Sequence, residues 1–449
     1  MLYRRPCRNR KAASLRKITM PKLYSDIDIN LCTRAVAECF QGKWTRNDIL
    51  TFIEEWAGID RVSLRKEALD GSCLLKAEAM DVIGTELMDV VEAVERGENL
   101  GDLIAPVIID ERVDGRSGKI RKIATLDIWH QLLGHVVKLS IEKLLNARIL
   151  PTQHASIPGH GQTRLKDQAR RYLHRDSLQI KCIQKTDVRH AYGTTMYSRV
   201  IGIIRREIPR AKRTLRVMEF LGTLAPEGHL IIGGYLDAWL FNFVMSYALR
   251  AVLSSGHERR GKVTYYVSRV ESYMDDFGIM APTKSGLRKA VKQLSQWLAK
   301  NLGLDLKLST GIILLLPTEA EEGRKKEQKA SRRACPGLDM AGYIIHRTYT
   351  TIRGRVFVSA RRQWLRAWRE LQSTGTLRLV RAQKIIAYNG YIVQSNSYKL
   401  KRKYHTSTLL AIAKAVTAFY GSQDSKRRRE RVYAQFERYE RYKAGFGAA

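Results

Sequence analysis

The sequence predicts an α+β fold, in which short strands and hairpins lie between helical regions. Three observations support this prediction. Apolar residues recur at helical spacing over residues 22–100, short β-branched and aromatic runs flank an Asp-Asp pair at residues 275–276, and the chain turns helical and strongly basic beyond residue 359. Short strands that alternate with helical segments of this length are typical of a mixed sheet-and-helix domain.

The N-terminal region, residues 1–105, is predicted to be a helical extension without a chemical signature. Its apolar residues follow helical spacing, and Asn47 is a candidate helix cap. The first 19 residues are basic and lack an apolar segment, so they do not resemble a secretory signal. We expect an alternative start at Met20 or a flexible phosphate-binding arm; a transit peptide is a weaker alternative.

Residues 107–125 predict a hairpin, because two short strands surround a Gly-Arg-Ser-Gly turn. The second strand carries Lys119, Arg121 and Lys122, and alternation places the first two on one face and the third on the other. Such a hairpin could bind a triphosphate or could simply be solvated, and the residues alone do not separate these alternatives. The glycine-rich stretch at residues 154–165 is similarly either a plain loop or a close approach to a nucleic-acid strand.

Two later segments predict a strand that ends in an aspartate and a long helix that begins at two glycines. Residues 179–197 predict a strand that ends in Asp187, with Tyr192 five residues further on. Residues 228–256 predict a long apolar helix that Gly233 and Gly234 open. Glycine lets the backbone approach a ligand closely, so the start of this helix is a candidate binding element.

The sequence YMDDFGIM places Asp275 and Asp276 between two predicted strands. An Asp-Asp pair in this position is often only a solvated turn, because aspartate favours turns. A catalytic role requires a third carboxylate, since Mg²⁺ prefers carboxylate and phosphate oxygens and two such ions can assist phosphoryl transfer. Asp187, at the end of a strand far away in sequence, is the candidate for that third ligand.

The C-terminal part continues with a helix that Ser285 could cap, a strand carrying Lys307, a charged linker over residues 319–335 and a further hairpin. Beyond residue 359, arginines surround the apolar face of a predicted helix, and tyrosines alternate with basic residues near position 395. This alternation suits base stacking combined with phosphate contact, although such tyrosines often only pack.

The composition favours a nucleic-acid partner. Lys and Arg number 79 and Asp and Glu number 44, which gives a net charge of +35. An excess of this size implies an acidic partner. No membrane partner is expected, because no apolar run approaches the roughly 20 residues of a spanning helix. The six cysteines show no CxxC spacing, so we expect reduced thiols and a cytoplasmic location.

The order of these segments resembles that of reverse transcriptases. YMDDFGIM is similar to the YxDD motif of that family, and KTDVRHAY is similar to its first catalytic motif. LIIGGYLDAWLFN matches the glycine and asparagine of the family's LPxGxxxSxxxxN pattern at Gly233 and Asn242. GKIRKI, LGLDLK and LDMAGYIIH resemble the fingers strand, the segment of the lysine behind the nucleotide, and the primer grip. The resemblance covers residues 107–400 and implies the fold of a right-hand polymerase.

The implied organisation has four parts: an N-terminal extension at residues 1–105, fingers at 106–180, a palm at 181–350 with a fingers insertion at about 198–228, and a basic helical thumb and tail at 351–449. The implied activity is that of an RNA-directed DNA polymerase, which adds dNTPs to a 3′-OH. Its partners would be an RNA template, the DNA product and dNTPs, and a homo-oligomer or a second protein is possible.

The resemblance also implies residue roles. Asp187 and Asp275, with Val188 in the same site, would bind two Mg²⁺, which Mn²⁺ could replace, and Asp276 would assist. Lys307 could protonate the leaving pyrophosphate. The remaining residues would contact the nucleotide, namely Lys119, Arg121, Lys122, Tyr192, Gly233 and Asp237, or the nucleic acid, namely Gly342, Tyr343, Arg361, Arg362, Tyr391 and Lys401. Tyr192 would select deoxynucleotides by blocking a ribose 2′-OH.

One segment departs from the family pattern. The position before Gly233 is Ile232, as in many bacterial enzymes, and Asp237 stands where the family has serine. We expect this carboxylate to alter template or nucleotide preference. The implied biological role is phage defence with a noncoding RNA, and the alternative is the mutagenic enzyme of a diversity-generating retroelement. A non-catalytic nucleic-acid-binding scaffold is the alternative from another class.

Overall fold

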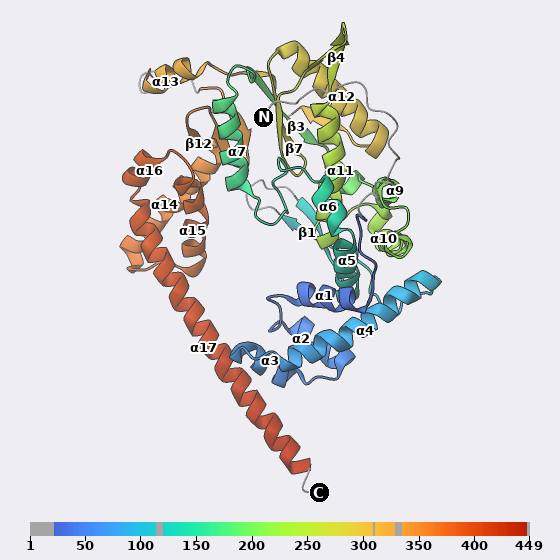
Figure 1. Cartoon of the computed structure of the whole chain (residues 1–449). Helices are drawn as coiled ribbons and strands as arrows, with labels where there is room; N and C mark the ends of the chain where they lie inside the picture. The colour runs from blue at the N-terminus through green and yellow to red at the C-terminus, as the bar shows by residue number, and fades with distance from the viewer. Residues whose placement is uncertain (1–21, 114–119, 309, 328–334, 447–449) are drawn as a thin grey trace, which may run out of the picture.

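The computed structural model describes residues 22–113, 120–308, 310–327 and 335–446, so Lys119 lies outside the described residues. The chain is a mixed α+β protein, as predicted, with a central antiparallel sheet between helical regions (Figure 1). Two apolar cores hold it together. The larger joins the N-terminal helices to one face of the sheet, and the smaller joins the other face to the C-terminal helices.

The N-terminal region is helical, as predicted. Its described part contains α1 (Ile29–Phe40), α2 (Asn47–Ala57), α3 (Arg61–Asp70) and α4 (Leu74–Arg96). The carboxylate of Asp28 caps α1 by accepting a hydrogen bond from the amide of Leu31 at 2.8 Å. The prediction that Asn47 caps α2 is wrong. Asn47 is the first helical residue, and its side-chain oxygen accepts a hydrogen bond from Arg65 of α3.

The first hairpin pairs β1 (Ile108–Val113) with β2 (Ile120–Thr125), and most of its residues are exposed. Helices α5 (Ile128–Ser140), α6 (Glu142–Arg148) and α7 (Gln162–Arg175) follow it. The amide of Ala124 donates a hydrogen bond of 2.8 Å to the carbonyl of Ile232. This bond attaches the hairpin to the loop that precedes α11.

The central sheet has the order β6-β7-β3-β8, and β9 also pairs with β3. Its strands are β3 (Cys182–Val188), β6 (Arg269–Tyr273), β7 (Asp276–Ala281), β8 (Leu306–Leu308) and β9 (Ile313–Leu314). The strand predicted before the Asp-Asp pair, from Thr264 to Val270, is divided in the structure. β5 (Lys262–Tyr265) ends before β6 begins and pairs with β4 (Gly256–Arg259). The predicted strand around Lys307 is likewise divided into β8 and β9.

Two helices cover one face of this sheet, α11 (Tyr235–Leu253) and α12 (Lys284–Leu302). Thr283 caps α12 by accepting a hydrogen bond from the amide of Gly286, so the predicted cap at Ser285 is wrong. By length and composition α11 could span a membrane, although no spanning helix was expected from the sequence. However, 67% of its apolar window is buried, as in the core helix of a soluble protein. Short helices α8 (Ala191–Thr194), α9 (Tyr197–Glu207) and α10 (Lys212–Leu224) link β3 to α11.

The opposite face of the sheet packs against α7 and a second small sheet of β10 (Leu338–Met340), β11 (Tyr343–Ile345) and β12 (Thr350–Ile352). Gly278 of β7 permits this packing, because an added Cβ would lie 2.7 Å from the sulfur of Met340. The segment predicted as a charged linker contains α13 (Thr318–Glu327). Glu321 of that helix is 1% exposed and accepts hydrogen bonds from the amides of Arg347 and Thr348.

The C-terminal region contains α14 (Gly354–Thr374), α15 (Leu379–Val393), α16 (Tyr398–Lys403) and α17 (Thr406–Phe446). Trp364 of α14 is 1% exposed and lies in the core shared with β10 and β11. The long helix α17 leaves this group and reaches α3 of the N-terminal region (Figure 1). The N-terminal and C-terminal regions are therefore in contact through α3 and α17.

Candidate active site

Four side chains form a row across one face of the central sheet. In the antiparallel register Tyr273 pairs with Asp276, Asp276 with Asp187, and Asp187 with Lys307. Directly paired residues of antiparallel strands point to the same face of a sheet. Asp276, the distant Asp187 and Lys307 are therefore brought together on one face of the sheet. We call Tyr273, Asp276, Asp187 and Lys307 the polar row.

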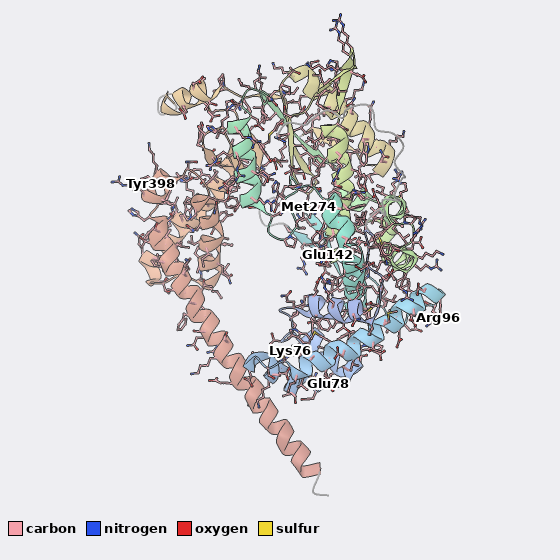
Figure 2. All side chains as sticks on the ribbon, in the orientation of Figure 1. Lys76, Glu78, Arg96, Glu142, Met274 and Tyr398 are labelled. Atoms are coloured by element: carbon pink, nitrogen blue, oxygen red, sulfur yellow. The ribbon has the colours of Figure 1, made fainter. Side chains whose placement is uncertain are left out.

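The hairpin between β6 and β7 places Asp275 at the end of this row. Met274 and Asp275 form a two-residue turn, and Met274 adopts φ +54°, which is uncommon for a residue other than glycine. The amide of Val188 donates a hydrogen bond of 3.1 Å to the carbonyl of Asp275. This bond ties the turn to the end of β3. Figure 2 labels Met274 near the middle of the molecule.

The carboxyl groups of Asp187 and Asp275 interact closely. Burial raises the pKa of Asp275 to about 7, and the charge of Asp187 and a hydrogen bond to it contribute to this shift. Burial also raises the pKa of Asp276, against the opposing charge of Lys185. The Nζ of Lys185 lies 2.9 Å from Oδ2 of Asp276. Acidic groups crowded in this way are stabilised by any cation that binds between them.

The donor set fits a hard divalent cation, because carboxylate oxygens are the ligands that Mg²⁺ prefers. The residues that would hold it are Asp187 and Asp275, with Asp276 beside them. The side chain of Val188 is buried, so only its backbone carbonyl could act as a ligand. Within the described part of the chain no group of three His, Cys, Asp or Glu side chains is arranged as a metal site. In the structure Asp276 forms an ion pair with Lys185.

Tyr192 lies beside the turn. Its hydroxyl is 3.6 Å from the sulfur of Met274, and its ring stacks on Phe241 with centroids 4.9 Å apart. Burial raises the pKa of Tyr192, and the charge of Asp275 adds to the shift. The side chain therefore lies next to the turn that carries Asp275.

Gly233 is fixed by the approach of the first hairpin. It adopts φ +112°, and an added Cβ would lie 2.8 Å from the carbonyl oxygen of Ala124 in β2. Both facts require glycine. Gly233 therefore allows close packing between this loop and the hairpin that carries Arg121 and Lys122. Those two cations lie opposite Arg112 and Glu111 of β1.

Replacement of Gly233 by alanine should lower the free energy of unfolding by about 1–3 kcal/mol, because the left-handed backbone and the close carbonyl both oppose a Cβ. Urea unfolding followed by circular dichroism would measure the change. Gly202, inside α9 with no atom near an added Cβ, supplies the control. Alanine at Gly202 should raise stability by up to about 1 kcal/mol. Equal effects at the two positions would contradict the role assigned to Gly233.

Asp237 has an internal role. It is 1% exposed, and its Oδ1 accepts hydrogen bonds of 2.9 Å from the hydroxyl of Tyr197 and from the amide of Ile231. Burial raises the pKa of Asp237 to about 6. The predicted direct contact between this carboxylate and a nucleotide is therefore not present in the structure. Asp237 instead positions the Ile231–Gly233 loop, through which it could act on a ligand indirectly.

Sequence reasoning missed the neighbours of β6. His154 Nε2 lies 2.6 Å from Glu271 Oε2, and both side chains are fully buried. Burial lowers the pKa of His154 to about 4 and raises the pKa of Glu271 well above its ordinary value, so the contact joins neutral groups. Asn242 of α11 donates to the carbonyl of Ala155 at 2.9 Å. The glycine-rich stretch is thus a fixed support of the polar row.

The residues predicted to contact nucleic acid fall into two sets. Tyr343 and Tyr391 are 3% and 7% exposed, with ring centroids 5.3 Å apart, so they pack against each other instead of presenting their rings to a ligand. Gly342 leaves room for this pair, since an added Cβ would lie 2.6 Å from the ring of Tyr391. The second set contains exposed or half-exposed cations on the C-terminal helices, namely Arg361, Arg362 and Lys401.

Comparison with known proteins adds no relative. No protein-family model matches the chain, and no curated protein matches its sequence. The functional assignment therefore depends on the geometry of the polar row and on the order of the motifs.

Proposed function

We propose that the protein is an RNA-directed DNA polymerase. The observation that carries this proposal is the convergence of three acids from two distant segments. Asp187 of β3 lies in register with Asp276 of β7, and its carboxyl group interacts with that of Asp275. The order of the six motifs in the sequence supports the same assignment.

In this proposal Asp187 and Asp275 hold the metal site and orient the primer terminus. When bound, two Mg²⁺ supply charge stabilisation for the in-line displacement of pyrophosphate. Lys185 neutralises Asp276 and keeps it close to the site. Tyr192 narrows the space next to the turn and thereby disfavours a ribose 2′-OH. Lys307 is exposed and lies in the same row, where it can donate a proton to the leaving group.

The proposed architecture assigns β1 and β2 to the fingers, the central sheet with α11 and α12 to the palm, and α14–α17 to the thumb. The N-terminal helices form an extension to it. Support comes from the bond between Ala124 and Ile232, which joins the first hairpin to the loop of Gly233 next to the sheet. Exposed cations such as Arg361 and Arg362 on α14 would hold the duplex by its phosphates.

Primer extension tests the proposal. Purified protein with Mg²⁺, dNTPs and a labelled DNA primer on an RNA template should extend the primer, and chelation of the metal should stop the reaction. RNA that co-purifies with the protein should be supplied as a second template and sequenced, because it identifies the partner in the proposed defence role. Tight binding without extension on any template would favour a non-catalytic scaffold.

A further inference from the structure

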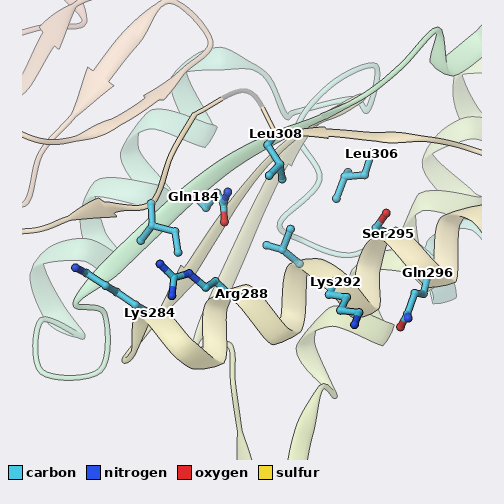
Figure 3. A pocket seen from close by; sticks show the side chains of 10 residues that line it. Gln184, Lys284, Arg288, Lys292, Ser295, Gln296, Leu306 and Leu308 are labelled. Atoms are coloured by element: carbon cyan, nitrogen blue, oxygen red, sulfur yellow. The ribbon is translucent and has the colours of Figure 1, made fainter.

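A groove with a volume of about 680 Å³ opens between α12 and β8 (Figure 3). The side chains that line it come from α12, β3, β8 and the turn after β8: Gln184, Lys284, Arg288, Val291, Lys292, Ser295, Gln296, Leu306, Leu308 and Ile312. Because Lys307 shares a face with Asp187, its neighbours Leu306 and Leu308 point to the other face. The groove therefore lies behind the polar row and belongs to no site described above.

Within the part of the chain that the structure describes, the cations of the groove have no acidic partner. Helix α12 contains five lysines and arginines and no acidic residue. Lys284, Arg288 and Lys292 follow one another at intervals of four residues, which places them on one side of the helix, and all three are exposed. Among the residues that the structure describes, none of the three forms an ion pair.

Helix stability does not explain these cations. Lys284 is the first residue of α12, where the partial positive charge of the helix end disfavours a cation. Arg288 begins the next turn. The three cations repel one another when no anion is bound. A polyanion in the groove would remove this repulsion and would therefore bind favourably.

The floor of the groove restricts the class of ligand. Val291, Leu306, Leu308 and Ile312 are apolar, and Leu308 is 58% exposed. Cations four residues apart on a helix are separated by about 6 Å along its axis. A ligand that fits has anionic groups repeated at about this interval and flat apolar faces between them. A single nucleic-acid strand has both, whereas a duplex keeps its bases stacked inside.

We propose that this groove binds a single strand of nucleic acid, with phosphates on Lys284, Arg288 and Lys292 and bases against Leu306 and Leu308. Ser295 and Gln296 supply donors and acceptors for base edges. The site goes beyond the proposed polymerisation, because a strand held there lies on the opposite face of the sheet from the carboxylates. It would hold a strand that is not being copied.

The test measures binding of a fluorescent single-stranded oligouridine to the whole protein, without dNTPs and with a saturating unlabelled primer–template duplex. The double variant Arg288→Gln/Lys292→Gln should bind about tenfold more weakly. The slope of log affinity against log salt should become shallower by about 1.4, because each contact to a single strand contributes about 0.7. The matched control Lys289→Gln/Lys300→Gln removes two charges from the same helix outside the groove and should change affinity less than twofold.

Photocrosslinking with thiouridine in the oligonucleotide supplies a second measurement. Crosslinks should map to β8 and α12 and should disappear in the groove variant. Equal losses in the two double variants would show that only total charge matters, and the proposal would be wrong. The proposal would also be overturned if an acidic leucine-bearing peptide, and not the RNA, depended on Arg288 and Lys292. Neither result bears on primer extension, which is assayed separately.

Discussion

Replacement of Asp187 by asparagine should lower the rate of primer extension by about 10⁴-fold or more. Asp187 occupies the centre of the polar row, in register with Asp276 on one side and Lys307 on the other. Asparagine keeps the size and hydrogen-bonding capacity of the side chain and removes the charge that would hold Mg²⁺. Single-turnover extension of a labelled primer at saturating dNTP would measure the loss.

Two controls separate a catalytic effect from a structural one. Asp81→Asn changes an exposed aspartate on α4 and should leave the rate unchanged. Affinity of the Asp187→Asn variant for primer–template should stay within about threefold of the unmodified protein, because most nucleic-acid affinity comes from contacts to phosphates. A variant that extends primers at the original rate would remove Asp187 from the proposed mechanism.

The convergence of the acids could be predicted because each lies at a recognisable strand end. Asp187 and the tandem pair were expected to meet, and the register places them together. Strand alternation could also have identified Lys185, which lies two residues before Asp187 on the same face, but a lysine on a strand gives no sign of which acid it will contact. The buried pair of His154 and Glu271 gave no sequence signal, because the two residues come from distant segments.

Predictions that depended on one residue type were the weakest. Asn47 and Ser285 both have side chains that favour a helix cap, yet the helices begin one or two residues from the positions predicted, where other contacts decide. Asp237 was expected to contact a nucleotide because it lies in the segment that resembles the family's LPxGxxxSxxxxN motif. Its environment is formed by Tyr197 of α9 and by the amide of Ile231 in the loop before α11, and only the tertiary structure reveals it.

Replacement of Asp275 by asparagine should stabilise the metal-free protein while it removes activity. The pKa of Asp275 is about 7 in the folded protein against an ordinary value of 3.8. The folded state therefore holds a proton that the unfolded state releases, and the stability that this group contributes is complete below about pH 4 and is lost as the pH rises to about 7. At pH 8 the carboxylate is charged next to Asp187, and the variant avoids this electrostatic cost.

Thermal unfolding in the presence of a chelator would test this expectation. The difference in Tm between Asp275→Asn and the unmodified protein should be smallest at pH 4 and should reach a few degrees at pH 8. Added Mg²⁺ should raise the Tm of the unmodified protein at pH 8 and should have little effect on the variant, because a ligand stabilises only the state that binds it. A carboxylate that is positioned to bind a cation destabilises the fold until the cation binds. A variant that is less stable than the unmodified protein at every pH would therefore show that Asp275 is a structural residue.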